Sequence, residues 1–220
     1  VVTGVSGAGK SSLVIDTLAP ALRRKLSGAG ESLPCGPIRI EGTLDDVSVV
    51  DPSGDWVRSP RSIVATLSGM LDELRSLYAS LPDSRMHGWN ASRFSPNTKG
   101  GRCETCGGLG EERIELHLLP DAWVPCSRCG GARFEPHTLS VRWKGLSIAE
   151  VLGTELDSLR VLFSNHPRLG PLADRLCAAG LGHLSPGRRS DSLSGGEALR
   201  LRLASAVGGG RSRKMWILDE

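Results

Sequence analysis

The sequence predicts a mixed α/β fold, in which an α/β core is interrupted by an inserted α+β module. A glycine-rich segment, GVSGAGKS, lies between an apolar run and a helical pattern, and the last residues are the apolar run MWIL followed by two acids. Two Cys-x-x-Cys-Gly-Gly units lie between these segments. We therefore expect a core at residues 1–50 and 191–220, with an inserted domain at 51–190 that carries a cysteine module at 100–135.

The first segments of the chain predict an alternation of strands and helices. VVTGVSGAGKSSLVIDTL fits a strand, a turn and a helix that ends or kinks near Pro20, because proline interrupts helical hydrogen bonding. IRIEG and VSVVD fit short strands. Residues 59–81 carry apolar side chains at helical spacing, which predicts one amphipathic helix with the buried positions Ile63, Leu67, Leu71, Leu74 and Leu77.

The later segments predict two more strands and several capped helices. RIELHLL and TLSVRWK alternate apolar and polar residues, as half-buried strands do. Ser147 and Glu150 form a capping-box pattern, Thr154 is placed to cap the next helix, and Gly180 is placed to end a helix. LSGGEALRLRLASAV reads as a Gly-Gly turn that runs into a helix, and KMWIL reads as a buried strand.

The segment Gly4–Ser11 fits the phosphate-binding loop G-x-x-x-x-G-K-[ST]. In such a loop, backbone N–H groups surround phosphate oxygens, the lysine reaches the β- and γ-phosphates, and the hydroxyl binds Mg²⁺. Lys10 and Ser11 would have these last two roles. The residues expected to bind ATP are Gly4, Ser6, Gly7, Ala8, Gly9, Lys10, Ser11 and Ser12.

Two further segments complete a nucleotide-site pattern. Asp219 and Glu220 follow an apolar strand, so we expect Asp219 to hold Mg²⁺ and Glu220 to polarise the attacking water. Upstream, LSGGE places small residues at a helix N-terminus, where an anion is favoured, although a plain helix-capping turn fits the same residues. The residues of this second phosphate contact are Ser194, Gly195, Gly196 and Glu197.

The two cysteine pairs predict a structural zinc site. Cys103, Cys106, Cys126 and Cys129 are spaced C-x₂-C-x₁₉-C-x₂-C. Four thiolates form a closed tetrahedral set that suits Zn²⁺. The Gly-Gly after each pair permits the positive φ that lets backbone N–H groups approach sulfur. A redox dithiol is the alternative, but such sites use one Cys-x-x-Cys pair at a helix start.

The segment before the first cysteine pair is basic. Residues 84–102 contain no acid and carry Arg93, Lys99 and Arg102, with Trp89 and Phe94 interleaved. The whole chain has a net charge of only +3, so any binding of nucleic acid has to be local. These three cations are the candidate DNA-phosphate contacts, and a solvated loop is the alternative. No apolar run is long enough to span a membrane.

In order and content, these motifs resemble the UvrA family of the ABC excinuclease, in its C-terminal nucleotide-binding half. The matching residues include VTGVSGAGKSSL, RFSPNTKGGRCETCGGLG, PCSRCGGARF, GLGHL, LSGGEALRLRLA and ILDE, and they extend over nearly the whole chain. The resemblance implies an ABC-type P-loop ATPase core and an inserted signature domain with a zinc module. In such ATPases, the LSGGE signature faces ATP that is bound by another nucleotide domain.

The resemblance also implies a function in nucleotide excision repair. It implies a cytoplasmic, DNA-binding dimer of the SOS response, which recognises damaged double-stranded DNA with ATP, Mg²⁺ and Zn²⁺ and loads a UvrB-type helicase for the excision nuclease. This segment alone would be an incomplete ATPase, since the segment after Glu220 and the second nucleotide domain are not in it.

Three departures from the family pattern leave other functions open. Pro52 replaces a glutamine that couples nucleotide to the inserted domain, Leu199 replaces another glutamine, and the segment PGRRSDS before the signature is unusual. Because proline has no side-chain amide, we expect weaker coupling of ATP to DNA. One alternative is a UvrA-like paralogue that gives resistance to DNA-binding drugs. Another is a non-hydrolysing, zinc-stapled DNA-binding module.

Overall fold

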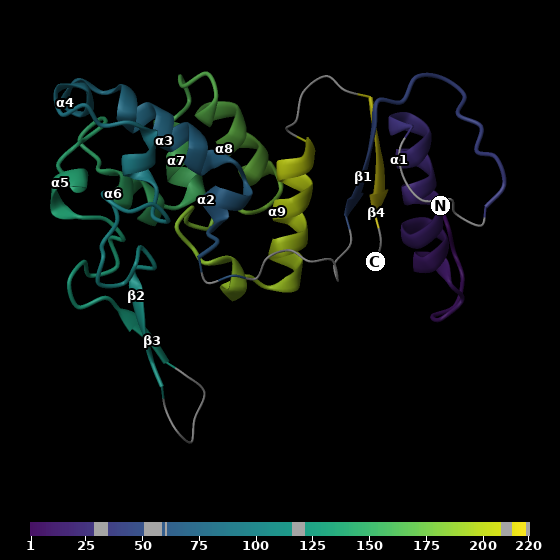
Figure 1. Ribbon diagram of the computed structural model, residues 1–220, viewed down its shortest axis with the longest axis horizontal. Coiled ribbons are helices and arrows are strands. Elements are labelled where there is room, and N and C mark those ends of the chain that lie inside the picture. Colours follow the sequence, from purple (N-terminus) through teal and green to yellow (C-terminus); the bar gives the residue numbers. More distant parts are fainter. Residues whose placement is uncertain (29–34, 51–58, 60, 116–121, 208–212, 219–220) are drawn as a thin grey trace. The chain divides into compact units, whose positions relative to one another are not determined.

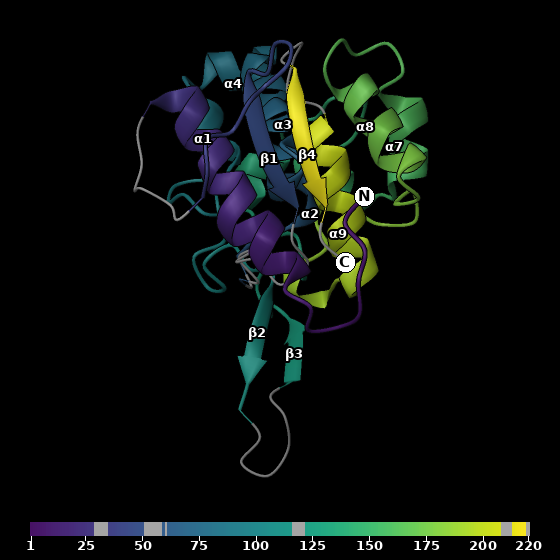
Figure 2. The same ribbon diagram turned by 90° about the vertical axis from the view of Figure 1, so that its right-hand side faces the viewer.

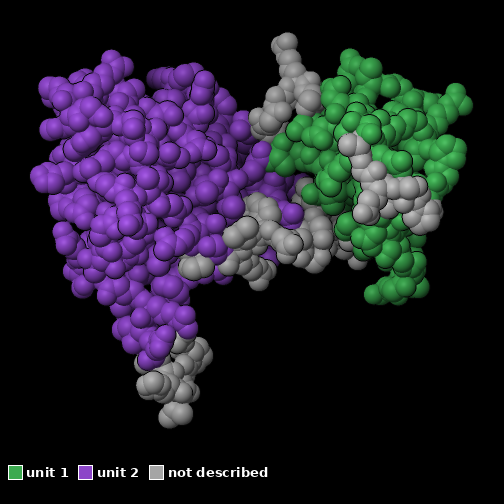
Figure 3. Space-filling view, viewed as in Figure 1, with its two compact units in different colours: residues 1–56, 206–220 green, residues 57–205 purple. Residues whose placement is uncertain are grey.

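The structure is a computed structural model that describes residues 1–28, 35–50, 59, 61–115, 122–207 and 213–218. It confirms the predicted mixture of helices and strands. The chain forms two compact units: unit 1 comprises Val1–Trp56 and Ala206–Glu220, and unit 2 comprises Val57–Ser205 (Figure 3). The sequence pattern assigns residues 191–205 to the nucleotide core, and in the structure these residues belong to unit 2. Their assignment to the nucleotide core stays a prediction.

Unit 1 contains one long helix and a small parallel sheet (Figure 1). The helix begins at Lys10 and continues through a π-helical segment, η1 (Ser12–Leu18), into α1 (Ala19–Ser27). Strand β1 (Asp46–Val50) pairs in parallel with β4 (Lys214–Leu218), with Val47 opposite Met215. A small core of Ala19, Leu22, Val47 and Ile217 joins the helix to the two strands.

Four expectations for unit 1 are wrong, wholly or in part. Residues 1–5 and the IRIEG segment are not strands, and β4 is a strand with only Ile217 buried, since Leu218 is 61% exposed. The helix does not end near Pro20. Pro20 lies directly after the π-helical segment, and the helix continues past it to Ser27.

Unit 2 is mainly helical, with one hairpin of two strands (Figures 1 and 2). The strands are β2 (Glu111–Ile114) and β3 (Ala122–Pro125), which pair antiparallel, with Glu111 opposite Pro125. In both views, the hairpin projects away from the helices of its unit. The helices are α2 (Val64–Leu67), α3 (Met70–Ser80), α4 (Pro82–Met86), η2 (Ala91–Phe94), α5 (Pro136–Leu139), α6 (Ile148–Gly153), α7 (Leu156–Leu162), α8 (Leu169–Ala178), η3 (Ser190–Ser192) and α9 (Gly195–Val207).

The helices of unit 2 surround one apolar core. Its largest fully buried side chains include Tyr78, Phe94, Phe134 and Phe163, together with leucines from α3, α7 and α8. The Tyr78 hydroxyl donates a hydrogen bond of 2.8 Å to the Leu146 carbonyl, so even the polar end of this ring is satisfied. This core fixes the residues from which the hairpin and α9 start.

Several local expectations for unit 2 are confirmed. Ser147 and Glu150 make the reciprocal capping box at α6. Gly180, with φ of 74°, follows the end of α8, where Gly180 N–H bonds to Cys177 O and Leu181 N–H bonds to Leu176 O. These two bonds define a Schellman motif, which satisfies carbonyls that the helix end leaves open.

Other expectations for unit 2 are wrong. The single helix at 59–81 is divided into α2 and α3 by Gly69, whose φ is 78°. The first hairpin strand begins earlier than RIELHLL, and its Ile114 is 44% exposed rather than buried. TLSVRWK is not a strand, because α5 and an isolated bridge from Trp143 to Leu146 occupy it. Thr154 bonds back to the Glu150 carbonyl and does not cap α7.

No helix within the described ranges is long and apolar enough to cross a bilayer.

Candidate functional site

The four predicted zinc ligands meet at the base of the hairpin. Their Sγ atoms all lie within 4.8 Å of one another, and Cys103, Cys106 and Cys126 are buried. The Cys103 and Cys126 Sγ atoms are 4.0 Å apart, and those of Cys106 and Cys129 are 3.8 Å apart. Four sulfurs at about 2.3 Å from one Zn²⁺ in a tetrahedron would be separated by about 3.8 Å. The cluster therefore has the size and ligand set of a structural zinc site.

The backbone around the cysteines matches two zinc knuckles. Gly110 N–H donates to Cys106 Sγ over 3.2 Å, and Cys126 N–H bonds to Gly110 O over 2.9 Å, which ties the second knuckle to the first. Gly108 has φ of 86°, and a Cβ there would lie 1.7 Å from the Pro96 carbonyl oxygen. Only glycine fits at this position, which gives a steric reason for one glycine of the first Gly-Gly pair.

Without metal, the pKa values of the cysteines are shifted in different directions. Burial raises the pKa of the Cys126 thiol to about 12, whereas the pKa of Cys103 is lowered, because hydrogen bonds from the Cys106 and Thr105 N–H groups outweigh its burial. A metal ion that binds here must displace protons, so metal binding at the cluster depends on pH. Zn²⁺ bound by these four cysteines would join the first knuckle to the second and fix the base of the hairpin.

The predicted phosphate loop lies in unit 1 and is closed over its lysine. Gly7 and Gly9 have φ of 80° and 81°, and the helix begins at Lys10. Lys10 Nζ donates to the carbonyl oxygens of Gly4 and Val5, each at 3.0 Å. The Lys10 ammonium thus lies against the same loop whose backbone N–H groups are expected to bind phosphate. The residues of this loop are exposed, and Lys10 itself is partly exposed.

The predicted signature segment lies in unit 2 and forms a helix cap. Ser194 N–H and Oγ donate to Glu197 Oε2 at 2.8 and 3.0 Å, and Glu197 N–H donates to Ser194 Oγ at 3.3 Å. His183 Nε2 lies 2.9 Å from the other carboxylate oxygen. These hydrogen bonds lower the pKa of Glu197 to about 2, and the hydrogen bond with His183 makes the largest contribution. Gly195 and Gly196 form the first turn of α9.

The catalytic candidates Asp219 and Glu220 lie outside the described residues, as does Pro52. Strand β4 ends at Leu218, directly before the two acids, opposite Val50 of β1. Their roles stay predictions.

The candidate DNA contacts differ in their surroundings. Arg93 Nε donates to Thr138 Oγ1 at 3.0 Å, and its guanidinium lies 4.4 Å from the Trp89 ring centroid. Arg102 pairs with Glu104 at 3.3 Å, with 15% of its side chain exposed. Lys99 is exposed. The two arginines therefore have structural contacts within unit 2, and Lys99 is the most accessible of the three.

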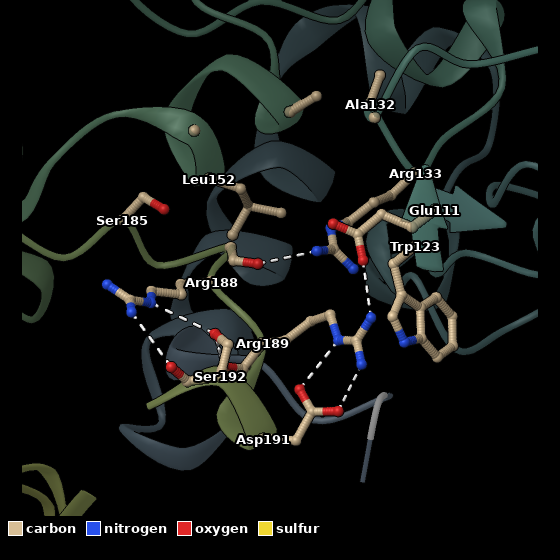
Figure 4. A pocket seen from close by; sticks show the side chains of 14 residues that line it. Glu111, Trp123, Ala132, Arg133, Leu152, Ser185, Arg188, Arg189, Asp191 and Ser192 are labelled. Atoms are coloured by element: carbon tan, nitrogen blue, oxygen red, sulfur yellow. Dashed lines mark hydrogen bonds and ion pairs between the residues drawn. The ribbon is translucent and has the colours of Figure 1, made fainter. Parts of the chain in front are cut away.

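An arginine cluster lies beside the hairpin base, where the sequence patterns had indicated no site. A cavity of about 530 Å³ there is lined by Arg133, Arg188 and Arg189, with Glu111, Trp123 and Asp191 (Figure 4). Arg133 Nη2 donates to Gly187 O at 2.9 Å, and burial lowers its pKa. The unusual PGRRSDS segment was the available signal, but only the structure shows that it lies against the hairpin.

Comparisons with curated proteins and with solved structures agree with each other. No model of a protein family matches the chain. The chain is 41% identical over 224 residues to UvrABC system protein A of Helicobacter pylori (strain ATCC 700392 / 26695), and the match covers 100% of this chain and 24% of that protein. The corresponding protein of Escherichia coli (strain K12) is 41% identical over 221 residues, with the same two coverages of 100% and 24%.

A solved structure agrees with these relatives. The crystal structure of UvrA2 from Deinococcus radiodurans matches with a TM-score of 0.81 and 38% identity, and the match covers 99% of this chain and 26% of that one. The chain thus spans about a quarter of the length of the curated relatives it matches. Over its whole length, the chain is therefore homologous to a segment of UvrABC system protein A.

Proposed function

We propose that the chain is part of a UvrA-type ABC ATPase that recognises damaged double-stranded DNA in nucleotide excision repair. The observation that carries the proposal is the 41% identity to UvrABC system protein A along the whole chain. The phosphate loop, the four-cysteine cluster and the capped LSGGE segment are the structural features expected for such a protein.

Each feature has a role in this proposal. The loop at Gly4–Ser12 binds ATP and Mg²⁺, and Asp219 and Glu220 support hydrolysis. Ser194 at the start of α9 contacts the γ-phosphate of an ATP held by another nucleotide domain, so the active form is a dimer or a pair of nucleotide domains. Zn²⁺ at the four cysteines fixes the hairpin that approaches DNA, and the protein passes the damaged site to a UvrB-type helicase.

Damage would be recognised by the deformability of DNA. A net charge of +3 gives no strong general attraction to DNA, so binding depends on local cations such as Lys99. A helix-distorting adduct lowers the energy needed to bend or unwind the duplex, and a protein that holds distorted DNA binds such a site more tightly.

A paralogue that confers resistance to DNA-binding drugs is a second candidate. It rests on the departures of this sequence from the family pattern, among them the PGRRSDS segment before the signature. The two candidates share the ATPase and differ in the lesion that stimulates it.

The test is ATP hydrolysis by the native protein, with and without duplex DNA. Lys10→Ala should reduce hydrolysis by about 100-fold or more, because the side chain that contacts the transferred phosphate is lost. The matched control is Lys25→Ala, which removes another lysine of unit 1 that donates to a backbone carbonyl, that of Ile38. Equal hydrolysis by Lys10→Ala and wild type would refute the ATPase assignment.

A further inference from the structure

We infer that Arg188 and Arg189 form a connection between the hairpin base and the signature helix, and that Arg189 is the positioning residue through which the hairpin controls the start of α9. This inference rests on the proposed function, since it gives the hairpin and the signature segment the roles described there. It adds a residue-level route between them within unit 2.

The backbone of the two arginines is held firmly by the start of α2. Val64 N–H donates to Arg188 O at 2.9 Å, and Ser190 N–H donates to Ser62 O at 2.8 Å. An isolated bridge also pairs Ile63 with Arg189. The two side chains therefore extend from a backbone that is fixed by hydrogen bonds. A change in the contacts of one side chain is thus not lost through displacement of a flexible loop.

Arg189 contacts both strands of the hairpin. Its Nη1 lies 2.8 Å from Glu111 Oε2 of β2, and its guanidinium carbon lies 4.0 Å from the ring centroid of Trp123 of β3 (Figure 4). Its Nε donates to Asp191 Oδ1 of η3 at 2.9 Å. Only 12% of the Arg189 side chain is exposed. A planar guanidinium can bind two carboxylates and stack on an aromatic ring at once, which an ammonium cannot do.

Arg188 contacts Ser192, which precedes the signature segment, and Glu197 within it. Its Nε donates to Ser192 Oγ at 3.3 Å and its Nη2 donates to Ser192 O at 3.2 Å. Its Nη1 lies 3.9 Å from Glu197 Oε1, the carboxylate that caps α9. Adjacent residues thus connect Glu111 of the hairpin to Glu197 of the signature segment.

The geometry allows this connection to change state. Glu111 and Trp123 are each 37% exposed, so a ligand on the hairpin can reach both partners of Arg189. The cavity of about 530 Å³ beside them gives the guanidinium room to change partners. When Arg189 leaves Glu111, its bond to Asp191 of η3 changes as well, the hold of Arg188 on Ser192 and Glu197 weakens, and the start of α9 is released.

The experiment uses the native, zinc-loaded protein and two measurements. The first is amide hydrogen exchange of residues 193–199 without ATP or DNA. The second is the ratio of ATP hydrolysis at saturating duplex DNA to hydrolysis without DNA. The variants are Arg189→Gln, Glu111→Gln and the double variant. The control is Arg160→Gln, which breaks an exposed pair of the same unit in which Arg160 Nε lies 2.8 Å from Asp174 Oδ1.

Arg189→Gln and Glu111→Gln should each speed exchange at 193–199 by about fivefold, and the double variant should add little, because one connection is broken in all three. DNA stimulation should fall by about fivefold or more, with the zinc content unchanged. Arg160→Gln should match wild type in both measurements. If Arg189→Gln fails to fold, Arg189→Lys replaces it as the test variant. Lysine keeps the positive charge but lacks the planar guanidinium, so faster exchange at residues 193–199 is expected.

Unchanged exchange in Arg189→Gln, or in Arg189→Lys as the substitute, would overturn the inference. So would a weaker affinity for DNA with full stimulation at saturation, since Arg189 would then act in DNA binding alone. If the wild-type protein neither hydrolyses ATP nor binds DNA, the proposed function fails, and hydrogen exchange still decides whether Arg189 connects the hairpin to α9.

Discussion

At the scale of single residues, Glu197 is the most connected side chain of the signature segment. One carboxylate oxygen accepts two hydrogen bonds from Ser194, and the other pairs with His183 at 2.9 Å and lies 3.9 Å from Arg188. These contacts fix the Ser194 hydroxyl. In the proposed function, Ser194 contacts the γ-phosphate of ATP. Glu197 therefore determines whether Ser194 is held in place.

The ionisation of Glu197 gives a pH prediction. Its folded-state pKa is lowered from 4.5 to about 2, so its stabilisation is fully present above pH 4.5 and is lost as the pH falls through about 2. In a ¹³C NMR titration, the Glu197 carboxyl signal should stay at its ionised position down to about pH 4. In His183→Gln the transition should move to higher pH, because the largest cause of the shift is removed.

A Glu197 signal that is half-shifted near pH 4.5 in the wild-type protein would contradict this account. A half-shifted signal near pH 4.5 in His183→Gln, but not in the wild-type protein, would support it. Ser194→Ala serves as the second comparison, since it removes the hydroxyl but keeps the backbone N–H that donates to the carboxylate.

At the scale of elements, the hairpin depends on the knuckles at its base. Gly108 and Gly131 are the second glycines of the two Cys-x-x-Cys-Gly-Gly units, and both have positive φ. A Cβ on Gly108 would lie 1.7 Å from Pro96 O, whereas a Cβ on Gly131 would meet nothing within 4 Å. Substitutions at the two positions therefore separate backbone strain from steric clash.

Gly131→Ala should cost about 1–2 kcal/mol, the cost of a left-handed alanine. Gly108→Ala should cost more than about 3 kcal/mol, because strain and clash add, and it should lose zinc more readily to a chelator. Chemical denaturation and zinc release measured on the two variants give the comparison. Equal losses in the two variants would show that the contact with Pro96 has no role in holding the knuckle.

Local sequence patterns predicted some elements well. The capping box at Ser147 and Glu150 and the helix end at Gly180 depend on residues within one turn, so they could be read directly. The strands predicted at IRIEG and TLSVRWK were wrong, because alternation over a few residues does not show whether a pairing partner is available. Gly69 divides a helix that apolar spacing alone predicts to be continuous.

The candidate site was predictable to a similar extent. Cysteine spacing identified four side chains that the structure brings within 4.8 Å of one another. The contacts of Arg189 were not predictable, because Glu111 and Trp123 are far from it in sequence and meet it only through the fold. Arg93 and Arg102 were read as surface cations because composition does not show intramolecular partners.

At the scale of the whole molecule, the four-cysteine hairpin distinguishes this chain from a generic ATPase with a phosphate loop and an LSGGE segment. The homology to UvrABC system protein A extends through all three features. The central claim is therefore that this chain belongs to a protein in which ATP use and recognition of distorted DNA are linked.

The most direct test is the affinity of the native protein for two duplexes of identical sequence, one of which carries a helix-distorting adduct. Fluorescence anisotropy would be measured at fixed salt, with and without ATP. We predict that the adducted duplex binds at least about tenfold more tightly, and that Lys10→Ala abolishes the effect of ATP on this ratio. Equal affinity for the two duplexes, with and without ATP, would contradict the central claim.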